Sequence, residues 1–401
     1  MPSTAAALPD QPDTTTRHGI GFAEFALALG GFALGTGEFA SMGLLPNVAR
    51  DVHTSIPATG HMISAYALGV VIGAPLLAAA FARTGRRTML VGLMSFFGLA
   101  NLLCAIASSY GLIIVARFLA GLPHGTYFGI ASLVAASLVP PHKRAQAVGR
   151  MMLGLSIANV VGVPFATWVG QLAGWRAAFA VVAALGFVTA ILCRIFLRPM
   201  PAPDHASPLT ELGALKNGQI WLTLGIAGIG FGGVFAVYSY ITPMLTIVTG
   251  LKEAQVPLVL SVIGAGMVGG SLFGGWLADR GIMRAVCITL LLNVVTLGLV
   301  AVSAHWAAAV TVNMFFVGFS ALSMGPPLQT RLMDIAADAQ ALAAALNHSA
   351  FNTANALGAW LGGMAIANGL GWTSTGPIGA VLALCGLAIW FVARIQDRKA
   401  L

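Results

Sequence analysis

The stretch Ala158-Asn159-Val160-Val161-Gly162 returns 196 residues later as Ala354-Asn355-Ala356-Leu357-Gly358. Three further matches, each 197 residues apart, are Gly174-Trp175 with Gly371-Trp372, Pro46 with Pro243, and Arg83 with Arg280. A nearly constant offset over scattered matches indicates an internal repeat. The chain of 401 residues therefore consists of two related halves of about 200 residues each.

Composition places both halves in a membrane. Charged residues make up only 8% of the chain, against about 25% in ordinary soluble domains. Hydrophobic residues reach 58%, and the mean hydropathy is +0.89. A bilayer accommodates this apolar surface because it is the solvent for it. Parallel halves of several membrane helices, with a site between them, are the plan of a large class of secondary transporters.

Uncharged apolar runs of roughly 20 residues predict the membrane helices. The sequence predicts an all-α integral membrane protein with twelve spans, arranged as two pseudo-symmetric six-helix bundles. The predicted spans are 20–44, 58–81, 88–107, 111–138, 148–171, 177–196, 220–247, 256–278, 285–303, 307–333, 341–368 and 375–394. The expected division is a tail 1–18, a bundle 19–197, a linker 198–219, a bundle 220–394 and a tail 395–401.

Basic residues predict the orientation of the spans. Sixteen of the 20 lie on the side of the N-terminus, and the opposite side holds only Arg50, Arg176 and Lys252. Because short loops rich in Lys and Arg stay in the cytoplasm, we expect both termini to be cytoplasmic. The basic clusters between apolar runs set this orientation, so the net charge of +8 does not indicate a nucleic-acid partner. We expect a monomeric, multi-pass protein of a bacterial inner membrane, in contact with lipid.

Several kinds of catalytic motif are missing from the sequence. No Lys is followed by Ser or Thr, and no His is followed by Glu, which excludes the Walker phosphate loop and the HExxH zinc motif. Residues 228–233 match GxGxxG by letter but lie in an apolar helix without a preceding strand, where small residues pack helices closely. We therefore expect no enzyme, no ATP-driven pump, no cofactor and no metal.

Two residues of opposite charge lie well inside predicted spans of the first half. Glu38 and Arg117 each fall about six residues from the outer end of their span, roughly 9–10 Å deep at 1.5 Å per residue. Buried ionisable groups in membranes usually carry function. We expect Glu38 to bind protons or substrate, and Arg117 to tune the pKa of its carboxyl group. The alternative is a static ion pair that orders the bundle.

Polar residues of two other spans are candidates for the cavity wall. His348, Asn352 and Asn355 lie together in the span 341–368, and Asn159 is the repeat counterpart of Asn355. His124, between two glycines, is a further candidate. The alternatives are interhelical hydrogen bonds for the polar group and a close helix contact at His124.

Two spans contain helix-breaking residues. Gly162-Val163-Pro164 lies in the span 148–171, and Gly325-Pro326-Pro327 lies in the span 307–333. Proline lacks the backbone N–H that continues a helix. Gly162, Pro164 and Pro326 are therefore candidate hinges for alternating access, with simple packing as the alternative.

At these positions the chain resembles the major facilitator superfamily. Arg83-Thr84-Gly85-Arg86-Arg87 is similar to the family's loop between spans 2 and 3, and Arg117-Phe-Leu-Ala-Gly121 to the span-4 motif of its proton-coupled members. The stretch from Gly154 to Gly170 resembles the span-5 motif of exporters. The resemblance implies the major facilitator fold and assigns Arg83, Gly85 and Arg86 to the inner gate.

A narrower resemblance is to bacterial arabinose-efflux permeases and chloramphenicol exporters. It rests on Gly35-Thr36-Gly37-Glu38-Phe39, Gly60-His61-Met62-Ile63-Ser64, Leu122-Pro123-His124-Gly125 and Gly174-Trp175-Arg176. The chain departs from the loop motif at Ala82, where the family usually has an acid. The copy of the loop motif in the second half keeps that acid as Asp279, followed by Arg280. The resemblance therefore adds Asp279 and Arg280 to the expected gate.

The sequence thus favours an antiporter that exports a small organic solute, drug-like or sugar-like, in exchange for protons that bind Glu38. The first alternative is a sugar or nucleoside uniporter or uptake permease in which Glu38 binds the solute. The second, from another class, is a membrane sensor or scaffold, which the absence of an extramembrane domain disfavours.

Overall fold

The computed structural model describes residues 14–81, 84–140, 144–200, 217–336 and 340–400. These residues form helices and short connections, with no strand in any of the five ranges. Most of the predicted tail 1–18 and linker 198–219 lie outside the described residues, as do Ala82 and Arg83. The all-α membrane fold predicted from the apolar runs is confirmed.

Six membrane spans make up the first half of the described chain. They consist of α1 (Thr14–Asp51), α3 (His61–Ala80) after the short α2 (Ile56–Thr59), α4 (Arg86–Ile106), α5 (Tyr110–Ser137), the composite span α6 (Arg144–Ile157), η2 (Ala158–Gly162) and α7 (Val163–Ala173), and α8 (Trp175–Phe196).

The second half follows the same order with more interruptions. Its spans are α10 (Gly218–Gly225), η4 (Ile226–Gly230) and α11 (Gly232–Ser239), then α13 (Val256–Ala278), α14 (Ile282–Gly298) with α15 (Val300–Ser303), α16 (Ala307–Ser323) with α17 (Gly325–Ala336), α18 (Gln340–Ala367) and α19 (Thr375–Ala400). Short elements α12 (Ile241–Pro243), η5 (Met244–Val248), η6 (Glu253–Gln255) and η7 (Trp372–Ser374) complete it.

Eleven helical segments among the described residues are long and apolar enough to cross a membrane. The predicted span without a counterpart among these eleven is 341–368, which is occupied by α18, a helix of 28 residues. Its shortfall in apolarity has a local cause, because Asn347, His348, Asn352 and Asn355 interrupt its apolar residues. The predicted span that falls short of this apolarity is therefore one that carries candidate residues for the cavity wall.

Two predicted spans end earlier than the helices that contain them. α1 covers Thr14–Asp51 rather than 20–44, and α19 continues to Ala400 rather than 394. Apolar runs mark the part of a helix within lipid, whereas both helices continue into polar sequence beyond it. Pro46 is included in α1 without ending it.

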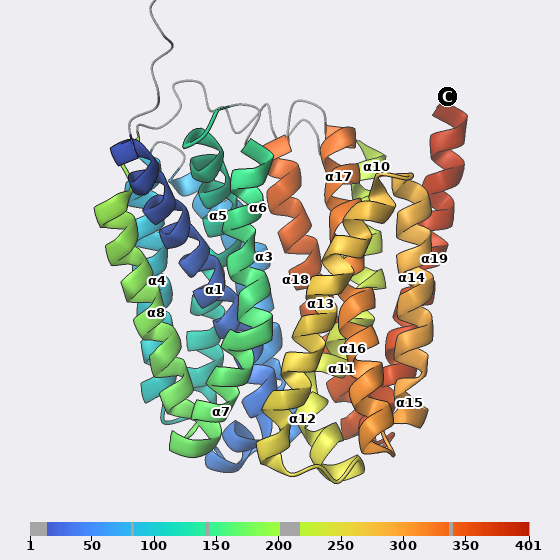
Figure 1. Cartoon of the computed structure of the whole chain (residues 1–401). Coiled ribbons are helices and arrows are strands. Elements are labelled where there is room, and N and C mark those ends of the chain that lie inside the picture. The colour runs from blue at the N-terminus through green and yellow to red at the C-terminus, as the bar shows by residue number, and fades with distance from the viewer. Residues whose placement is uncertain (1–13, 82–83, 141–143, 201–216, 337–339, 401) are drawn as a thin grey trace, which may run out of the picture.

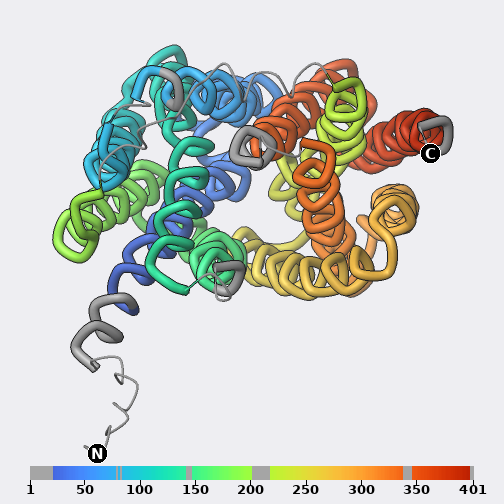
Figure 2. Tube along the Cα trace, turned by 90° about the horizontal axis from the view of Figure 1, so that it is seen from above, coloured from blue at the N-terminus to red at the C-terminus, as the bar shows by residue number. Residues whose placement is uncertain are grey.

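The two halves form separate bundles that lie side by side (Figures 1 and 2). α1 to α8 make one bundle, α10 to α19 the other, and α18 and α13 lie at the border with the first bundle (Figure 1). α1 begins and α19 ends at the same end of the molecule, which we call the terminal end; the other is the far end (Figure 1). The predicted pair of six-helix bundles is thus confirmed.

Close helix contacts repeat with the same 197-residue offset. A Cβ atom added at Gly69 or Gly73 of α3 would collide with a backbone carbonyl of α5, at Phe118 or Leu122. The counterparts on α13 are Gly266 and Gly270, which meet the carbonyls of Phe315 and Phe319 on α16. Membrane helices associate closely where small residues let their backbones approach, so the repeat preserves two equivalent helix pairs.

This contact predicts different effects at two neighbouring glycines. Gly270→Ala should destabilise the protein by about 1–3 kcal/mol, because its methyl group would press on the Phe319 backbone. Gly269→Ala is the matched control, since its Cβ would lie 3.5 Å from a flexible Phe319 side chain. Thermal unfolding in detergent at one scan rate measures both. Equal melting temperatures for the two variants would contradict the close contact.

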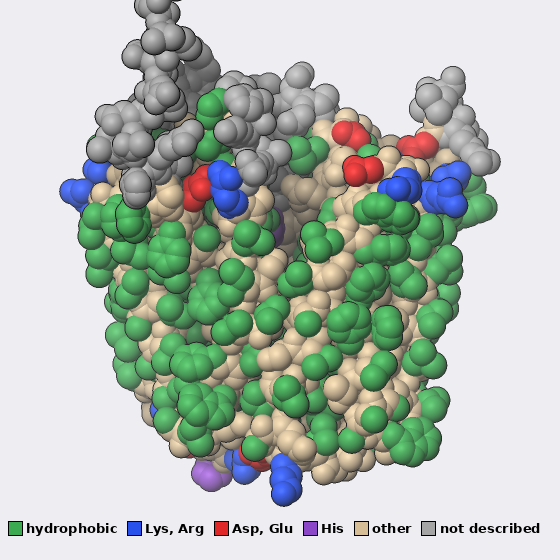
Figure 3. Space-filling model, viewed as in Figure 1, with side chains coloured by type: hydrophobic (Ala, Val, Ile, Leu, Met, Phe, Trp, Pro, Cys, Tyr) green, Lys and Arg blue, Asp and Glu red, His purple; other side chains and the backbone are tan. Residues whose placement is uncertain are grey.

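The outer surface is apolar around its middle and charged at its ends (Figure 3). Large aliphatic side chains lie exposed on it, among them Leu272 at 74% and Leu172 at 69%. Such a surface is stable in lipid rather than in water. Figure 3 also shows a hollow between the bundles at the terminal end, with histidine atoms visible inside it.

Candidate functional site

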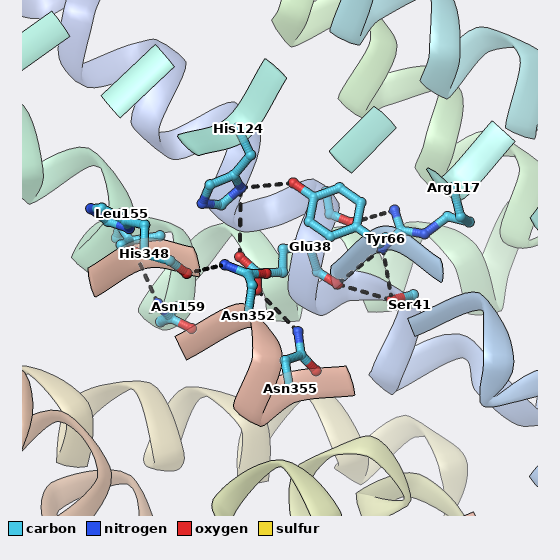
Figure 4. Close-up of polar contacts among 11 residues, drawn as sticks. Glu38, Ser41, Tyr66, Arg117, His124, Leu155, Asn159, His348, Asn352 and Asn355 are labelled. Carbon is cyan, nitrogen blue, oxygen red and sulfur yellow. Dashed lines mark hydrogen bonds and ion pairs between the residues drawn. The ribbon is translucent and has the colours of Figure 1, made fainter. Parts of the chain in front are cut away.

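Glu38 lies in the middle of α1 and is 4% exposed. Gly37, the residue before it, packs against Phe97 of α4 and Val182 of α8, so this part of α1 is deep in the first bundle. Successive helical residues point about 100° apart, and Glu38 points instead toward the second bundle. There its Oε1 accepts a hydrogen bond of 3.1 Å from Nδ2 of Asn355 on α18 (Figure 4).

His124 of α5 lies on the other side of the same carboxylate. Its Nδ1 is 3.8 Å from Oε2 of Glu38 and 2.9 Å from the hydroxyl of Tyr66 on α3 (Figure 4). Its ring centre is 6.3 Å from that of His348, and His348 stacks on Phe128 with ring centres 5.1 Å apart. The structure thus brings the predicted residues Glu38, His124, His348 and Asn355 together from three helices and both bundles.

Arg117 binds the backbone of α1 rather than the carboxylate of Glu38. Its Nη1 donates to the Gly37 carbonyl at 2.8 Å, and its Nη2 lies 3.4 Å from both the Glu38 carbonyl and the Ser41 hydroxyl. Its guanidinium also lies 4.3 Å from the ring centre of Tyr66. Among the described residues, no ion pair joins Arg117 to Glu38. The guanidinium therefore fixes the segment of α1 that carries Glu38, and its charge acts on the carboxylate from beyond direct contact.

Three asparagine side chains lie in the same region as the carboxylate (Figure 4). Asn352 and Asn159 each donate from Nδ2 to their own helix, at the carbonyls of His348 and Leu155. The Oδ1 atoms of Asn159, Asn352 and Asn355 are buried and have no hydrogen-bond partner within the described chain. A buried polar atom without a partner costs free energy. These three atoms are therefore available acceptors for a solute or for water.

Further hydrogen bonds join the two bundles on the far-end side of the site. Thr242 of α12 donates to the carbonyls of Met42 and Gly43 on α1, at 3.3 and 3.0 Å. Beyond it, Gln171 donates to the Glu253 carbonyl at 2.9 Å, and Arg50 pairs with the Glu253 carboxylate at 3.2 Å. With the hollow on the other side, the described residues form an arrangement open at the terminal end and closed at the far end (Figure 3).

The predicted gate residues lie at the terminal end. Gly85 precedes α4, and the backbone N–H of Arg86 donates to the Met200 carbonyl at 3.1 Å. Asp279 follows the last residue of α13, and Arg280 folds back over the Trp276 ring at 3.7 Å. Arg83 lies outside the described residues. The positions agree with a gate at this end, and their gating role stays a prediction.

The predicted hinges coincide with interruptions in the helices. Gly162 ends the π-helical turn η2, and Pro164 lies in the first turn of α7. Pro326 lies in the first turn of α17, directly after α16 ends. π-helical turns often mark functional positions in helices. Movement about these points stays a prediction.

Tyr66, Ser41 and Phe128 belong to the site but were not predicted. Tyr66 and Phe128 are 0% and 1% exposed and enclose His124, and Ser41 shares the Glu38 carbonyl with Arg117. The sequence did offer one sign of this part of the site. Tyr66 is a polar aromatic residue in the middle of an apolar span, close to the quoted segment 60–64. For metals, no cluster of three or more His, Cys, Asp or Glu occurs in the part of the chain that the structure describes.

Residues 27–341 match the family model described as Major Facilitator Superfamily. "Inner membrane transport protein YdhP" of Escherichia coli (strain K12) is 40% identical over 373 residues, covering 93% of this chain and 95% of that protein. The "Chloramphenicol resistance protein" of Streptomyces lividans is 31% identical over 366 residues, covering 90% and 91%.

A solved structure has the same fold. A bacterial homologue of the human lysosomal transporter Spinster, in an inward-facing and unoccupied conformation, superposes with a TM-score of 0.73. The alignment covers 95% of this chain and 98% of that one, at 16% sequence identity. At this identity the likeness shows the fold alone.

Proposed function

The chain belongs to the Major Facilitator Superfamily, whose members are transporters and not enzymes, and from that premise we propose that it exports a small organic solute in exchange for protons. The observation that carries the proposal is the position of Glu38, buried between the bundles with its carboxylate hydrogen-bonded across their border. An ionisable group there is costly and is retained for transport in many membrane proteins.

Protonation of Glu38 connects proton binding to movement of the bundles. An ionised carboxylate accepts a charge-assisted hydrogen bond from Asn355, and protonation weakens that bond. Without it, α1 and α18 are held together less strongly at this depth. A proton that arrives from outside and binds Glu38 would therefore favour the state in which α1 and α18 are separated. Release of that proton to the inside would favour the state in which they are joined.

The chemistry of the surrounding wall favours a neutral solute with both an apolar and a polar part. Phe231 and Phe351 lie 4.8 Å apart by ring centres, and Phe39 stacks on Phe235 across the border at 6.3 Å. The free oxygen atoms of the asparagines add hydrogen-bond acceptors. Drug-like and sugar-like molecules both have this character, and one relative is named for chloramphenicol resistance.

We place the terminal end on the cytoplasmic side of an inner membrane. The proposal rests on the distribution of basic residues, sixteen on that side and three on the other. One relative is named an inner membrane transport protein. The arrangement described above is then the inward-facing state, with both termini in the cytoplasm and the protein as a monomer.

Closure of the far end predicts an effect at Thr242. Thr242→Val keeps the shape of the side chain but removes its donor to the Met42 and Gly43 carbonyls. Loss of a hydrogen bond of about 1 kcal/mol should shift the ratio of the two states toward the outward-facing one about fivefold. Pulsed electron paramagnetic resonance with spin labels at the exposed residues Ser108 and His305 measures the distance between the two bundles at the far end.

Thr246→Val is the control for this experiment. Thr246 donates to the Thr242 carbonyl of its own helix and not across the bundles, so its loss should leave the distance distribution unchanged. Identical distributions for Thr242→Val and the wild type would contradict the role of Thr242 in closing the far end.

The proposed function is tested in everted membrane vesicles with an imposed pH gradient. Phenicols, pentoses, thiogalactosides and purine nucleosides are added one at a time, with vesicles lacking the protein as control. Export by antiport predicts that at least one compound dissipates the gradient and accumulates in the vesicles. Equilibration of a compound across the membrane without proton movement would instead support a sugar or nucleoside uniporter.

A further inference from the structure

A line of titratable side chains leads from Glu38 toward the hollow. Oε2 of Glu38 is 3.8 Å from Nδ1 of His124, and the His124 and His348 rings are 6.3 Å apart by their centres (Figure 4). Glu38 and His124 are only 4% and 2% exposed, whereas His348 is half-buried. Of the three, His348 is therefore the one in contact with solvent.

Glu38 itself is shut off from water in this state, although the proposed antiport requires it to exchange a proton with the terminal side. Its Oε1 is occupied by Asn355, and Arg117 binds the backbone behind it. Oε2 faces the His124 ring. A neutral imidazole can accept a proton on one nitrogen and release a different one from the other.

We propose that His124 and His348 carry protons between Glu38 and the hollow at the terminal end, an inference that rests on the proposed proton antiport. The proton on Oε2 of Glu38 crosses the 3.8 Å gap to Nδ1 of His124 through one bridging water, which makes the ring an imidazolium. Nε2 of the same ring then gives its proton to His348, directly or through one bridging water. His348 releases a proton to the hollow. His124 regains its starting tautomer when Nε2 takes a proton from the bridging water and Nδ1 gives its proton back to water.

Tyr66 orients the first ring of this path. Its hydroxyl lies 2.9 Å from the same Nδ1 that faces Glu38 and donates to it while His124 is neutral. The O–H turns away as the proton reaches Nδ1, and the hydroxyl oxygen then accepts from the new N–H. Tyr66 thereby holds the ring with Nδ1 toward α1. It is a positioning residue, because it does not pass the proton on.

The other charged group near the path offers no competing route. Arg117 faces the opposite side of the Tyr66 ring, and its Nη atoms donate to oxygen atoms of α1. Guanidinium groups do not release protons in proteins. The titratable and charged groups that face His124 are thus Glu38 on α1, Tyr66 on α3 and His348 on α18, with Arg117 behind Tyr66.

The test follows protonation of Glu38 in the purified full-length protein after a rapid pH change. Infrared absorption of its carboxylic acid group reports the rate, and the band is assigned by its loss in Glu38→Gln. His348→Ala and His124→Gln should slow protonation by about tenfold or more, as expected when a positioned proton carrier is removed. Added imidazole should restore the rate of His348→Ala. His305→Ala, at an exposed far-end residue, should keep the wild-type rate.

His348→Phe separates proton transfer from packing. A phenyl ring preserves the stack on Phe128 but cannot carry a proton, so the proposal expects it to be as slow as His348→Ala. A wild-type rate in His348→Phe, or failure of imidazole to accelerate His348→Ala, would overturn the relay alone. Absence of any pH-dependent Glu38 band in the wild type would overturn both the relay and the proposed antiport.

Discussion

Replacing Glu38 by Gln should abolish proton-coupled export while leaving the protein folded. The amide of Gln still offers an oxygen to Nδ2 of Asn355, so the bond across the bundles has a substitute. The variant cannot bind and release a proton. We expect export driven by a pH gradient to fall by about a hundredfold or more, as for loss of an essential acid–base group.

Solute exchange in the absence of a gradient distinguishes lost coupling from lost binding. Counterflow needs only that the loaded protein changes state, so Glu38→Gln should retain it within about twofold of the wild type. Glu24→Gln is the matched control on the same helix, since Glu24 pairs with Arg150 at 2.6 Å away from the site. Undiminished gradient-driven export in Glu38→Gln would remove Glu38 from the coupling mechanism.

Replacing Arg117 by Met should produce the largest loss of stability. Arg117 is fully buried, donates to three oxygen atoms of α1 and lies against Tyr66. Met fills much of the volume but leaves the Gly37 carbonyl without its donor. Removing one partner from such a buried polar set costs about 3 kcal/mol, which should lower the melting temperature by about 5 °C.

Arg150→Met is the control for this prediction. Arg150 also binds a carboxylate, but its side chain is 39% exposed, so its pair contributes only about 0–1 kcal/mol. Export should fall in Arg117→Met as well, because the segment that carries Glu38 is no longer fixed. Equal melting temperatures for the two variants would contradict the role of Arg117 as an anchor for α1.

Periodic features of the sequence predicted the membrane helices well, since lipid imposes a minimum length of apolar sequence on each span. The 197-residue repeat predicted two bundles, and the glycine contacts of α3 and α13 preserve it in three dimensions. Helix ends were less predictable. α1 and α19 extend past their apolar runs, and α1 does so even through Pro46.

Local helix geometry was beyond sequence reasoning at several points. Pro164 indicated an interruption, but not that a π-helical turn would precede it at η2. The apolar sequence from α10 to α11 did not predict the second π-helical turn, η4. A π-helical turn inserts one residue into a helix, and its free energy depends on neighbouring helices rather than on local residues.

The sequence predicted how deep the central residues lie in the membrane, but not which way their side chains point. Glu38 and Arg117 were expected at the same level and are found there, yet Arg117 binds carbonyl groups and Glu38 binds Asn355 of the other bundle. The direction of a side chain depends on helix rotation, which tertiary contacts such as those of Gly37 determine. Contacts between the bundles, such as that of Thr242 with α1, could not be predicted from a single sequence.

The most direct test of proton antiport is proton release when solute is added to the purified protein in weakly buffered solution. The compound is the one that the vesicle experiment identifies, and Glu38→Gln is the control. If Glu38 serves proton and solute in turn, solute addition releases protons from the wild type and none from the variant. Solute binding to the wild type with no proton release would contradict antiport through Glu38 and favour facilitated diffusion.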